Sequence, residues 1–435
     1  MSETSLLRWI EDFSRNRKEP SWMTRLRKAA LSEFLKMKPE SKDPEIDLEA
    51  LIASITEEKP QISSLEELPK EVLEQLERLG ISREEQSIIT GATVNLDNTL
   101  VYSNLKDMLR KQGVLIESTD DAVRKYDWMR DYMFRLLDYR MNRIVALHIA
   151  FWSGGVTARF PKDIKILYPI NAFFLIISEG IGQTEHTLVI ADENSEIHFT
   201  EGCTAPVLAK YSVHLGGTEV YVMKNSKVRL TSLQNWHGNV HHRPVKASVV
   251  YKNASVDMVS INLGSTTVYS RPKIYLRGKN ANGISQTISF IDKTRYVGGG
   301  GIIIHQAPYT TSEILNRAVL KDKGVEEFHG RINVEKSAPK SKAHMACNSY
   351  LISPTAKSLT VPELYTEIDD VALSHEAVVG RVGEEQLFYL ESMGFDENES
   401  LALIVNGFFE PILKDLPFEY VVEIRKIIDL AMKGA

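Results

Sequence analysis

The sequence predicts a mainly β protein in which a β-solenoid lies between helical segments. Apolar residues fall at helical spacing before about residue 150 and after Gly383, and in short β-rich runs between these limits. Turn motifs that begin with asparagine recur about every 30 residues in the strand region, which is typical of repeat architectures. With 435 residues, 43% of them apolar, the chain can bury a large core in two or three domains. We therefore expect an N-terminal helical domain over 1–150, a solenoid core over 151–380 and a C-terminal helical domain over 381–435.

Charge and hydropathy narrow the class of protein. The 52 basic and 58 acidic residues give a net charge of -6, which does not indicate a partner among nucleic acids or membrane surfaces. No apolar run is long enough to span a bilayer, and the first residues, MSETSLLRWIEDF, lack the apolar core of a signal peptide. We expect a cytoplasmic protein. Cys203 and Cys347 form no disulfide framework, and either can be a small buried hydrophobe.

The N-terminal part is predicted to be helical with one interruption. A helix starts near Pro20 and Ser21, and its apolar face is formed by Trp22, Met23, Leu26, Ala30, Phe34 and Met37. Residues 38–69 contain four prolines and many charged residues, and we expect a flexible linker with one short helix near 48–55. Helical spacing returns over 71–79 and over a long stretch, 121–150.

From about residue 153 the pattern becomes one of short strands. Four turns start with Asn194, Asn225, Asn253 and Asn280, a residue type that tolerates the left-handed conformation, and strands generally follow. One coil of a solenoid cannot bury its apolar edge alone, so coils stack and the two ends need covers, which the flanking helices would supply. A β-sandwich is the alternative, but it does not predict asparagine turns at this period.

The C-terminal part is helical. Asp396 and Glu399 form a capping-box pattern ahead of an apolar face, and Pro417 opens a last helix. These apolar faces exceed what the end of a solenoid requires. We expect them to pack within the chain, and a partner that covers part of this surface is the alternative.

The stretch 361–390 joins the strand pattern to the helical pattern and carries the candidate site. His375 and Glu376 follow several carboxylates, among them Glu363 and Glu367. From these residues alone we expect a solvated acidic turn, and the alternative is a metal site or proton transfer, which an imidazole beside carboxylates suits.

Two other motifs do not predict a site. Gly298–Gly301 lacks the Gly-Lys-Ser/Thr of a phosphate loop, and we expect a turn there. His237, His241 and His242 are not placed on one helix face, so we expect an exposed loop, with iron delivery as the alternative.

Six motifs in order resemble the SufB/SufD family of iron-sulfur cluster assembly proteins. They are Lys18-Glu-Pro-Ser-Trp-Met23, Glu201-Gly-Cys-Thr-Ala-Pro206, Gln234-Asn-Trp236, His375-Glu-Ala377, Gly383-Glu-Glu-Gln-Leu-Phe-Tyr389 and Ile404-Val-Asn-Gly-Phe408. The resemblance covers nearly the whole chain. It implies a right-handed parallel β-helix between helical domains, a C-terminal domain that docks the ABC-type ATPase SufC, and a nascent cluster at the interface of two paired subunits.

The resemblance also implies roles for single residues. Cys203 matches a cysteine that takes in sulfur, and Gln234 and Trp236 match residues along the sulfur route. His375 aligns with the interface histidine of SufD-like subunits, and Glu376 with the interface glutamate of SufB-like ones. Thr366 stands where SufB-like chains carry a cysteine proposed as a cluster ligand. Cys347 and Glu367 are further candidates.

We therefore expect a non-enzymatic scaffold for a transient iron-sulfur cluster. Its partners would be a SufC-like ATPase, a second copy or another SufB/SufD-type subunit, and a cysteine desulfurase or other sulfur donor; use of reduced flavin stays open. Imidazole and carboxylate ligands would hold a cluster less tightly than thiolates and so release it more readily. The alternatives are a SufD-like architectural subunit that carries no cluster, and a β-helix polysaccharide lyase or hydrolase.

Overall fold

A computed structural model describes residues 2–57, 59–78, 91–178, 180, 182–205, 211–236, 239–414, 416 and 418–432. Leu79, Pro206, His237 and Pro417, which the sequence analysis singled out, lie outside these residues. The helices are α1 (Glu3–Asn16), α2 (Ser21–Lys36), α3 (Leu48–Thr56), η1 (Leu65–Glu67), α4 (Lys70–Arg78), α5 (Asp107–Lys111), α6 (Thr119–Lys125), α7 (Met129–Tyr132), α8 (Arg143–Phe151), α9 (Glu384–Ser392), α10 (Glu397–Leu413) and α11 (Phe418–Met432).

The strands lie mainly between α8 and α9. They are β1 (Gly91–Leu96), β2 (Thr99–Leu105), β3 (Leu115–Ser118), β4 (Val156–Phe160), β5 (Ile170–Leu175), β6 (Gly182–Gln183), β7 (His186–Ala191), β8 (Glu196–Thr204), β9 (Ser212–His214), β10 (Gly217–Val222), β11 (Lys227–Asn235), β12 (Val240–His242), β13 (Val245–Val250), β14 (Ser255–Asn262), β15 (Thr267–Tyr269), β16 (Lys273–Leu276), β17 (Asn282–Ile291), β18 (Tyr296–His305), β19 (Thr311–Leu320), β20 (Val325–Val334), β21 (Ser341–Leu351), β22 (Lys357–Thr366) and β23 (Val371–Arg381).

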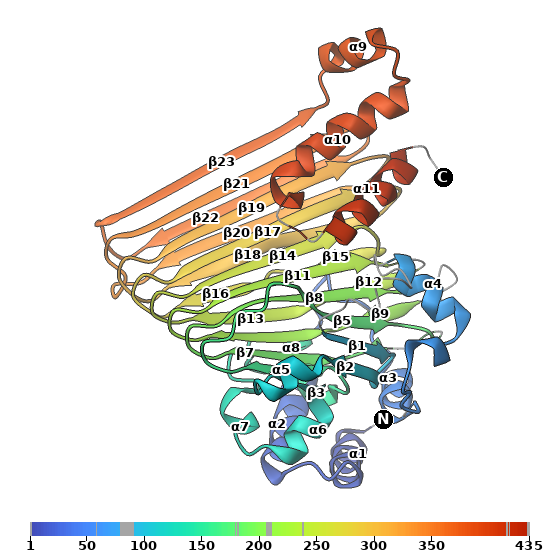
Figure 1. The fold of residues 1–435 in the computed structure, drawn as a ribbon, viewed down its shortest axis with the longest axis vertical. Helices are drawn as coiled ribbons and strands as arrows, with labels where there is room; N and C mark the ends of the chain where they lie inside the picture. The colour runs from blue at the N-terminus through green and yellow to red at the C-terminus, as the bar shows by residue number, and fades with distance from the viewer. Residues whose placement is uncertain are drawn as a thin grey trace.

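These strands form a β-solenoid of about seven turns, as the sequence predicts (Figure 1). The strands build two sheets. The first runs β2-β1-β5-β8-β11-β14-β17-β19-β21-β23, and the second contains β4, β7, β10, β13, β16, β18, β20 and β22. Successive coils pair in parallel and in register, while β2 and β3 add antiparallel strands at the N-terminal end. Each sheet therefore presents one face to the interior of the solenoid and one face outward.

The predicted asparagine turns are confirmed. Asn194, Asn225, Asn253 and Asn280 all have positive φ, between 56° and 62°. Their side chains form a ladder: Asn225 donates to Asn194 (2.8 Å), Asn253 to Asn225 (3.2 Å) and Asn280 to Asn253 (2.9 Å). A short side chain that tolerates the left-handed region thus also fixes the register of one coil on the next.

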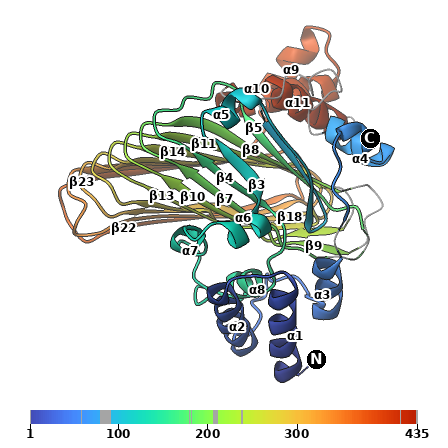
Figure 2. The ribbon, with the colours of Figure 1, turned by 60° about the horizontal axis from the view of Figure 1, so that its bottom comes forward.

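The flanking helices cover the outer faces of the sheets rather than the C-terminal end of the stack (Figures 1 and 2). Helices α1, α2 and α8 share one apolar cluster with β7, β10 and β13, and helices α4, α10 and α11 share another with strands such as β14 and β17. The burial of the strands explains this arrangement. Strands β7 and β10 are buried on both faces, whereas β20 alternates between buried and half-buried residues and needs no cover. The expectation of end covers was therefore wrong for the last coil, β22–β23.

The first 150 residues are not all helical. Strands β1 and β5 pair in parallel, and β3 pairs with β4, so residues 91–118 extend the solenoid. The long helix predicted over 121–150 is also absent. The backbone turns at Phe134, whose φ is 57°, because the buried Glu219 carboxylate accepts the N–H groups of Phe134 (2.5 Å), Leu136 (2.6 Å) and Leu137 (3.2 Å). Helix α8 then starts afresh at its cap, Asn142.

The segment predicted as a flexible linker is anchored to the solenoid. Its short helix α3 matches the prediction, and Ser54 on that helix donates to the Gly182 carbonyl (2.8 Å). Asp43 pairs with Arg243, and Lys42 pairs with Glu327 (2.5 Å). In the described part of the chain, no helix combines the length and apolar character that crossing a bilayer would demand.

Gly298–Gly301 lies inside strand β18, so the predicted turn was wrong. Strand β18 pairs with β15 through its first residues and with β16 through its last, and the glycines occupy the change of partner. At Gly300 φ is 141°, and a Cβ there would meet the His329 carbonyl oxygen at 2.0 Å. Only glycine fits this position.

Candidate functional site

The predicted sulfur residues meet inside the solenoid. Parallel pairing of β8 and β11 puts Cys203 opposite Gln234. The Gln234 amide donates to the Cys203 sulfur (3.3 Å), and the Trp236 indole N–H donates to the Gln234 carbonyl oxygen (2.9 Å). Three side chains that the sequence analysis grouped by resemblance are thus one hydrogen-bonded row, and all three are buried.

A buried ion pair faces this row. The Lys246 amine on β13 donates to the Glu201 carboxylate (2.6 Å) and to the Ser232 hydroxyl (2.7 Å), and Thr218 donates to the other Glu201 oxygen (2.9 Å). Ser232 also accepts from Gln234 (2.7 Å), which links the ion pair to the cysteine row. The interior around Cys203 is therefore a connected polar network within an apolar solenoid.

The environment keeps Cys203 a thiol. Burial, followed by the charges of Glu185 and Glu201, raises the pKa of Cys203 well above its ordinary value, and Lys246 and Gln234 only partly oppose this. The cavity beside it measures about 10 Å³, barely enough to hold one water molecule. The thiolate that nucleophilic sulfur chemistry requires is disfavoured in this closed conformation.

Two histidines extend the network. His214 contacts Glu185 (2.6 Å) through Nε2 and His242 (2.7 Å) through Nδ1, and its ring lies 4.7 Å from the Trp236 ring. Burial, then His214 and Lys246, lowers the pKa of His242 well below its ordinary value. The expected exposed loop was therefore wrong for His242, because β12 turns this side chain into the interior; His241 is half-buried beside Thr267.

Cys347 is also buried in the interior, on β21, in the same apolar cluster as Cys203. Burial, then the charge of Glu326, raises the pKa of Cys347 to about 12. Glu326 accepts hydrogen bonds from Asn316 (2.8 Å), Ser349 (2.6 Å) and Ser358 (2.9 Å). The second cysteine thus lies beside a buried carboxyl group.

The predicted cluster ligands lie on the last strand, β23, and both are exposed. Successive residues of a strand point to opposite faces. His375 pairs with Met345, which faces the interior, whereas Glu376 shares the other face with His344, whose Nε2 lies 3.9 Å from the carboxylate. His344 also contacts Ser374 (2.9 Å). The structure therefore separates His375 from Glu376 across one strand and brings His344 to Glu376.

Thr366 and Glu367 lie at the turn between β22 and β23. The Thr366 hydroxyl donates to the Ile368 carbonyl (2.6 Å) and accepts from the Ile368 N–H (3.1 Å), so its own turn uses its polar groups. The Glu367 N–H bonds to the Val334 carbonyl (3.1 Å). Among the residues that the structure describes, no three His, Cys, Asp or Glu side chains lie close enough to hold a metal ion.

Comparison with known proteins decides the family. A family model described as "SUF system FeS cluster assembly, SufBD core domain" matches residues 174–408. The chain is 39% identical to an "iron-sulfur cluster assembly SufBD family protein" of Pyrococcus horikoshii, over 98% of this chain and 96% of that protein. It is 34% identical to the "iron-sulfur cluster assembly protein SufB" of Bacillus subtilis, over 98% of this chain and 92% of that protein. This chain belongs to the SufBD family of iron-sulfur cluster assembly proteins.

The interior of this SufBD chain holds polar residues that the sequence analysis missed: Glu185, Glu201, His214 and Lys246. A signal for Glu201 was present. Alternation in the strand puts Glu201 on the same face as Cys203, and a charged side chain on the inner face of a buried strand needs a partner. His344 could be found in the same way, because the period of the turns places residue 344 beside residue 374. Nothing in the local sequence marks Lys246, which reaches Glu201 only through the coiling of the chain.

Proposed function

We propose that this SufBD chain is a non-enzymatic cytoplasmic scaffold on which a nascent iron-sulfur cluster forms where the last coil meets a second copy. ATP hydrolysis would belong to a SufC-like partner. The cluster is cargo, which arrives as iron and sulfur and leaves as an assembled group.

The open last coil carries this proposal. Strands β22 and β23, of 10 and 11 residues, end their sheets with mostly exposed or half-buried side chains. Exposed apolar residues gather there: Leu359, Leu364, Tyr365, Val378 and Val379. Long uncovered edge strands with apolar side chains are unusual in a protein that stays monomeric. A second copy related by a two-fold axis would cover the same surface on both molecules.

Pairing would also complete a ligand set. At the open end, each copy presents two imidazoles, His344 on β21 and His375 on β23, together with the Glu376 carboxylate. Because β23 is the edge strand, side chains on both of its faces stay within reach of a partner edge. Nitrogen and oxygen donors bind iron-sulfur clusters less tightly than thiolates do, which suits a site that must release its product.

Sulfur would enter through Cys203. The Cys203 thiolate would attack the outer sulfur of a donor persulfide, so that a new S–S bond forms at Cys203 and the donor leaves as a thiolate; no oxidant is needed. Because burial holds Cys203 as a thiol, this step needs the interior to open, which would expose the sulfur and let the thiol lose its proton.

Helix α9 would dock the ATPase. Nothing in α9 is buried, and Phe388 and Tyr389 are 72% and 63% exposed. Helices α10 and α11 are tied to the solenoid, through Arg317 to the Phe408 carbonyl (2.6 Å) and through Tyr420 to Thr200 (3.0 Å). Movement of a docked ATPase would therefore be transmitted to the coils that carry the site.

Anaerobic incubation of the purified chain with iron and sulfide, with and without the ATPase, tests the proposal. We expect charge-transfer absorption in the wild type, its loss in His375→Ala, and its retention in His329→Ala, a matched control on β20. Equal absorption in both variants would contradict the role of His375.

The architectural SufD-like subunit is the second candidate, and one observation favours it. Thr366 stands where a ligand cysteine is expected, and its hydroxyl forms hydrogen bonds within its own turn. A colourless wild type that still binds the ATPase would support this candidate, and so would absorption that appears only in Thr366→Cys.

A further inference from the structure

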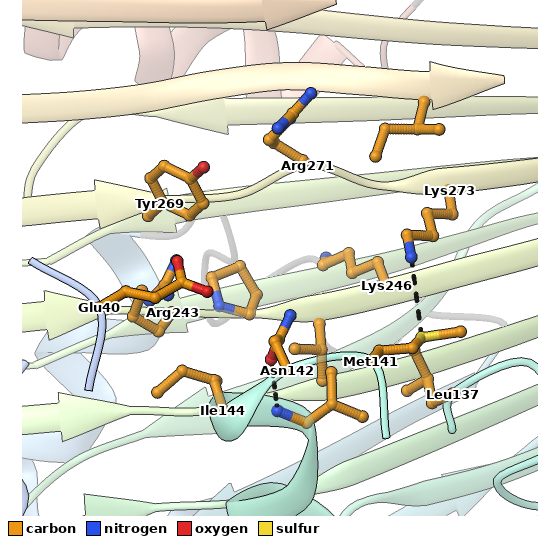
Figure 3. A pocket seen from close by; sticks show the side chains of 14 residues that line it. Glu40, Leu137, Met141, Asn142, Ile144, Arg243, Lys246, Tyr269, Arg271 and Lys273 are labelled. Atoms are coloured by element: carbon orange, nitrogen blue, oxygen red, sulfur yellow. Dashed lines mark hydrogen bonds between the residues drawn. The ribbon is translucent and has the colours of Figure 1, made fainter. Parts of the chain in front are cut away.

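A basic cleft lies outside the solenoid, between the N-terminal end of helix α8 and the second sheet (Figure 3). Its volume is about 270 Å³, slightly below the roughly 300–1,000 Å³ of pockets for drug-sized ligands. Glu40 is the one carboxylate among the described residues that line it. Four cationic side chains also line it: Arg243, Lys246, Arg271 and Lys273. The size and charge of the cleft suit a small anion.

Two of the four cations are already neutralised. Arg243 pairs with the buried Asp43, and the Lys246 amine bonds to Glu201 on the interior side of the sheet. Arg271 and Lys273 differ, because within the described ranges neither makes an ion pair. The Lys273 amine instead contacts the Met141 sulfur (3.7 Å), a weak acceptor, across the cleft in Figure 3.

These two cations are partly desolvated without compensation. Burial, then the neighbouring charge of Arg271, lowers the pKa of Lys273. The Nε atoms of Arg243 and Arg271 are buried and have no hydrogen-bond acceptor in the described part of the chain. Buried donors and unpaired charges cost free energy unless something accepts from them. An oxygen-rich anion in the cleft would supply the counter-charge that Arg271 and Lys273 lack among the residues that the structure describes.

Helix α8 adds to the positive potential. Its nine residues start beside the cleft, where the Asn142 side chain accepts from the Val145 N–H (2.9 Å) and lines the cleft. The N-terminal end of a helix carries a partial positive charge that favours anions. The helix therefore acts in the same direction as Arg271 and Lys273.

We propose that this cleft binds a small oxoanion, such as phosphate or sulfate or the phosphate group of a larger molecule, held mainly by Arg271 and Lys273. The planar guanidinium group would provide paired donors and the amine a point charge, as in other phosphate sites. The site does not depend on the proposed cluster chemistry. It does share a wall with the Cys203 pocket, because Pro244 and Lys246 line both cavities.

Calorimetric titration of the full-length protein with phosphate, sulfate and adenosine diphosphate tests this proposal. We expect saturable binding that weakens with added sodium chloride. Arg271→Gln and Lys273→Gln should each weaken it about 10- to 100-fold, the usual effect of losing one hydrogen bond to a charged group. Lys252→Gln, which removes an exposed lysine outside the cleft, should leave affinity unchanged.

Different outcomes identify the ligand or overturn the proposal. Equal affinity for phosphate and the nucleotide indicates a free anion, and much tighter nucleotide binding indicates a phosphate group on a larger molecule. No binding at millimolar concentrations, or equal binding in all variants, would overturn it. If a glutamine variant unfolds, Arg271→Lys keeps the charge, and phosphate should raise the melting temperature of the wild type more than chloride at equal ionic strength.

Discussion

At the scale of single residues, two buried carboxyl groups of the interior are stabilised in different ways. Glu201 has a cationic partner, Lys246, at 2.6 Å and a donor, Thr218. Among the described residues, Glu326 receives hydrogen bonds from neutral donors alone, namely Asn316, Ser349 and Ser358. Removing the cation from a buried ion pair is costly, because the remaining charge stays buried without a partner. At Glu326 burial favours the protonated form, and the three neutral donors only partly oppose this effect.

Replacement of Lys246 by methionine should destabilise the fold by about 3–5 kcal/mol, because Glu201 would remain buried without its cation. Adding Glu201→Gln should recover much of this loss. Urea denaturation of the two variants and the wild type measures both effects. A double variant as unstable as Lys246→Met would contradict the assignment of the cost to the unpaired charge.

Glu326→Gln should raise the free energy of unfolding at pH 8, and the gain should shrink toward pH 4.5. Burial raises the pKa of Glu326 above its ordinary 4.5. The native state therefore binds this proton more tightly, and the contribution of Glu326 to stability is full below pH 4.5 and is lost as the pH rises through the folded pKa. Thermal unfolding at several pH values measures the difference.

Glu327→Gln is the matched control with the opposite sign. Hydrogen bonds from Lys42, His329 and Tyr296 lower the pKa of Glu327 to about 2. Its contribution is present above pH 4.5 and is lost as the pH falls through about 2. If both variants showed the same pH dependence of stability, burial would not be the reason for the opposite pKa shifts of Glu326 and Glu327.

At the scale of elements, the asparagine ladder sets the spacing of the coils. Each ladder residue has a left-handed backbone, and the side chains of Asn225 and Asn253 form hydrogen bonds with the coils before and after them. The same turn position is occupied by Tyr309 and Lys340 in the later coils, also with positive φ. The backbone conformation is thus kept where the side-chain ladder ends.

Asn225→Ala should cost about 1–3 kcal/mol, from left-handed strain and the loss of two ladder hydrogen bonds. Asn225→Gly should cost less, since glycine removes the strain but not the hydrogen-bond loss. Lys224→Ala, at an exposed neighbour, is the control and should stay within about 0.5 kcal/mol of the wild type. Chemical denaturation gives the three free energies of unfolding. A glycine variant that is less stable than the alanine variant would exclude backbone strain as a cause.

At the scale of the whole molecule, the solenoid is covered unevenly. Helices cover the outer faces of the early coils, antiparallel strands extend the sheets at the N-terminal end, and the last coil is open (Figure 2). An open end on a stack of parallel strands presents unpaired N–H and C=O groups together with apolar side chains. This asymmetry is why we propose that copies meet at β22 and β23.

Val378→Lys should convert a two-copy assembly into a monomer, because a lysine amine would be buried against a partner edge. Light scattering after size-exclusion chromatography measures the mass. Val378 is 56% exposed in one copy, so the fold itself should lose less than about 0.5 kcal/mol. Leu167→Lys, at a 90% exposed apolar residue between β4 and β5, should leave the assembly intact. A wild type that is already monomeric would contradict pairing through this coil.

The sequence by itself determined the solenoid, its asparagine turns, the short helix α3 and the capping box that starts α10, because each depends on local conformational preference or on a repeat that one coil cannot satisfy alone. It also marked the row of Cys203, Gln234 and Trp236. Only the tertiary structure decided that Glu219 interrupts the helix expected over 121–150, that β23 separates His375 from Glu376, and that Lys246 reaches Glu201. Those outcomes depend on contacts between residues far apart in the chain. A buried charge or N–H group without a partner costs free energy, and these partners meet only when the coils have formed.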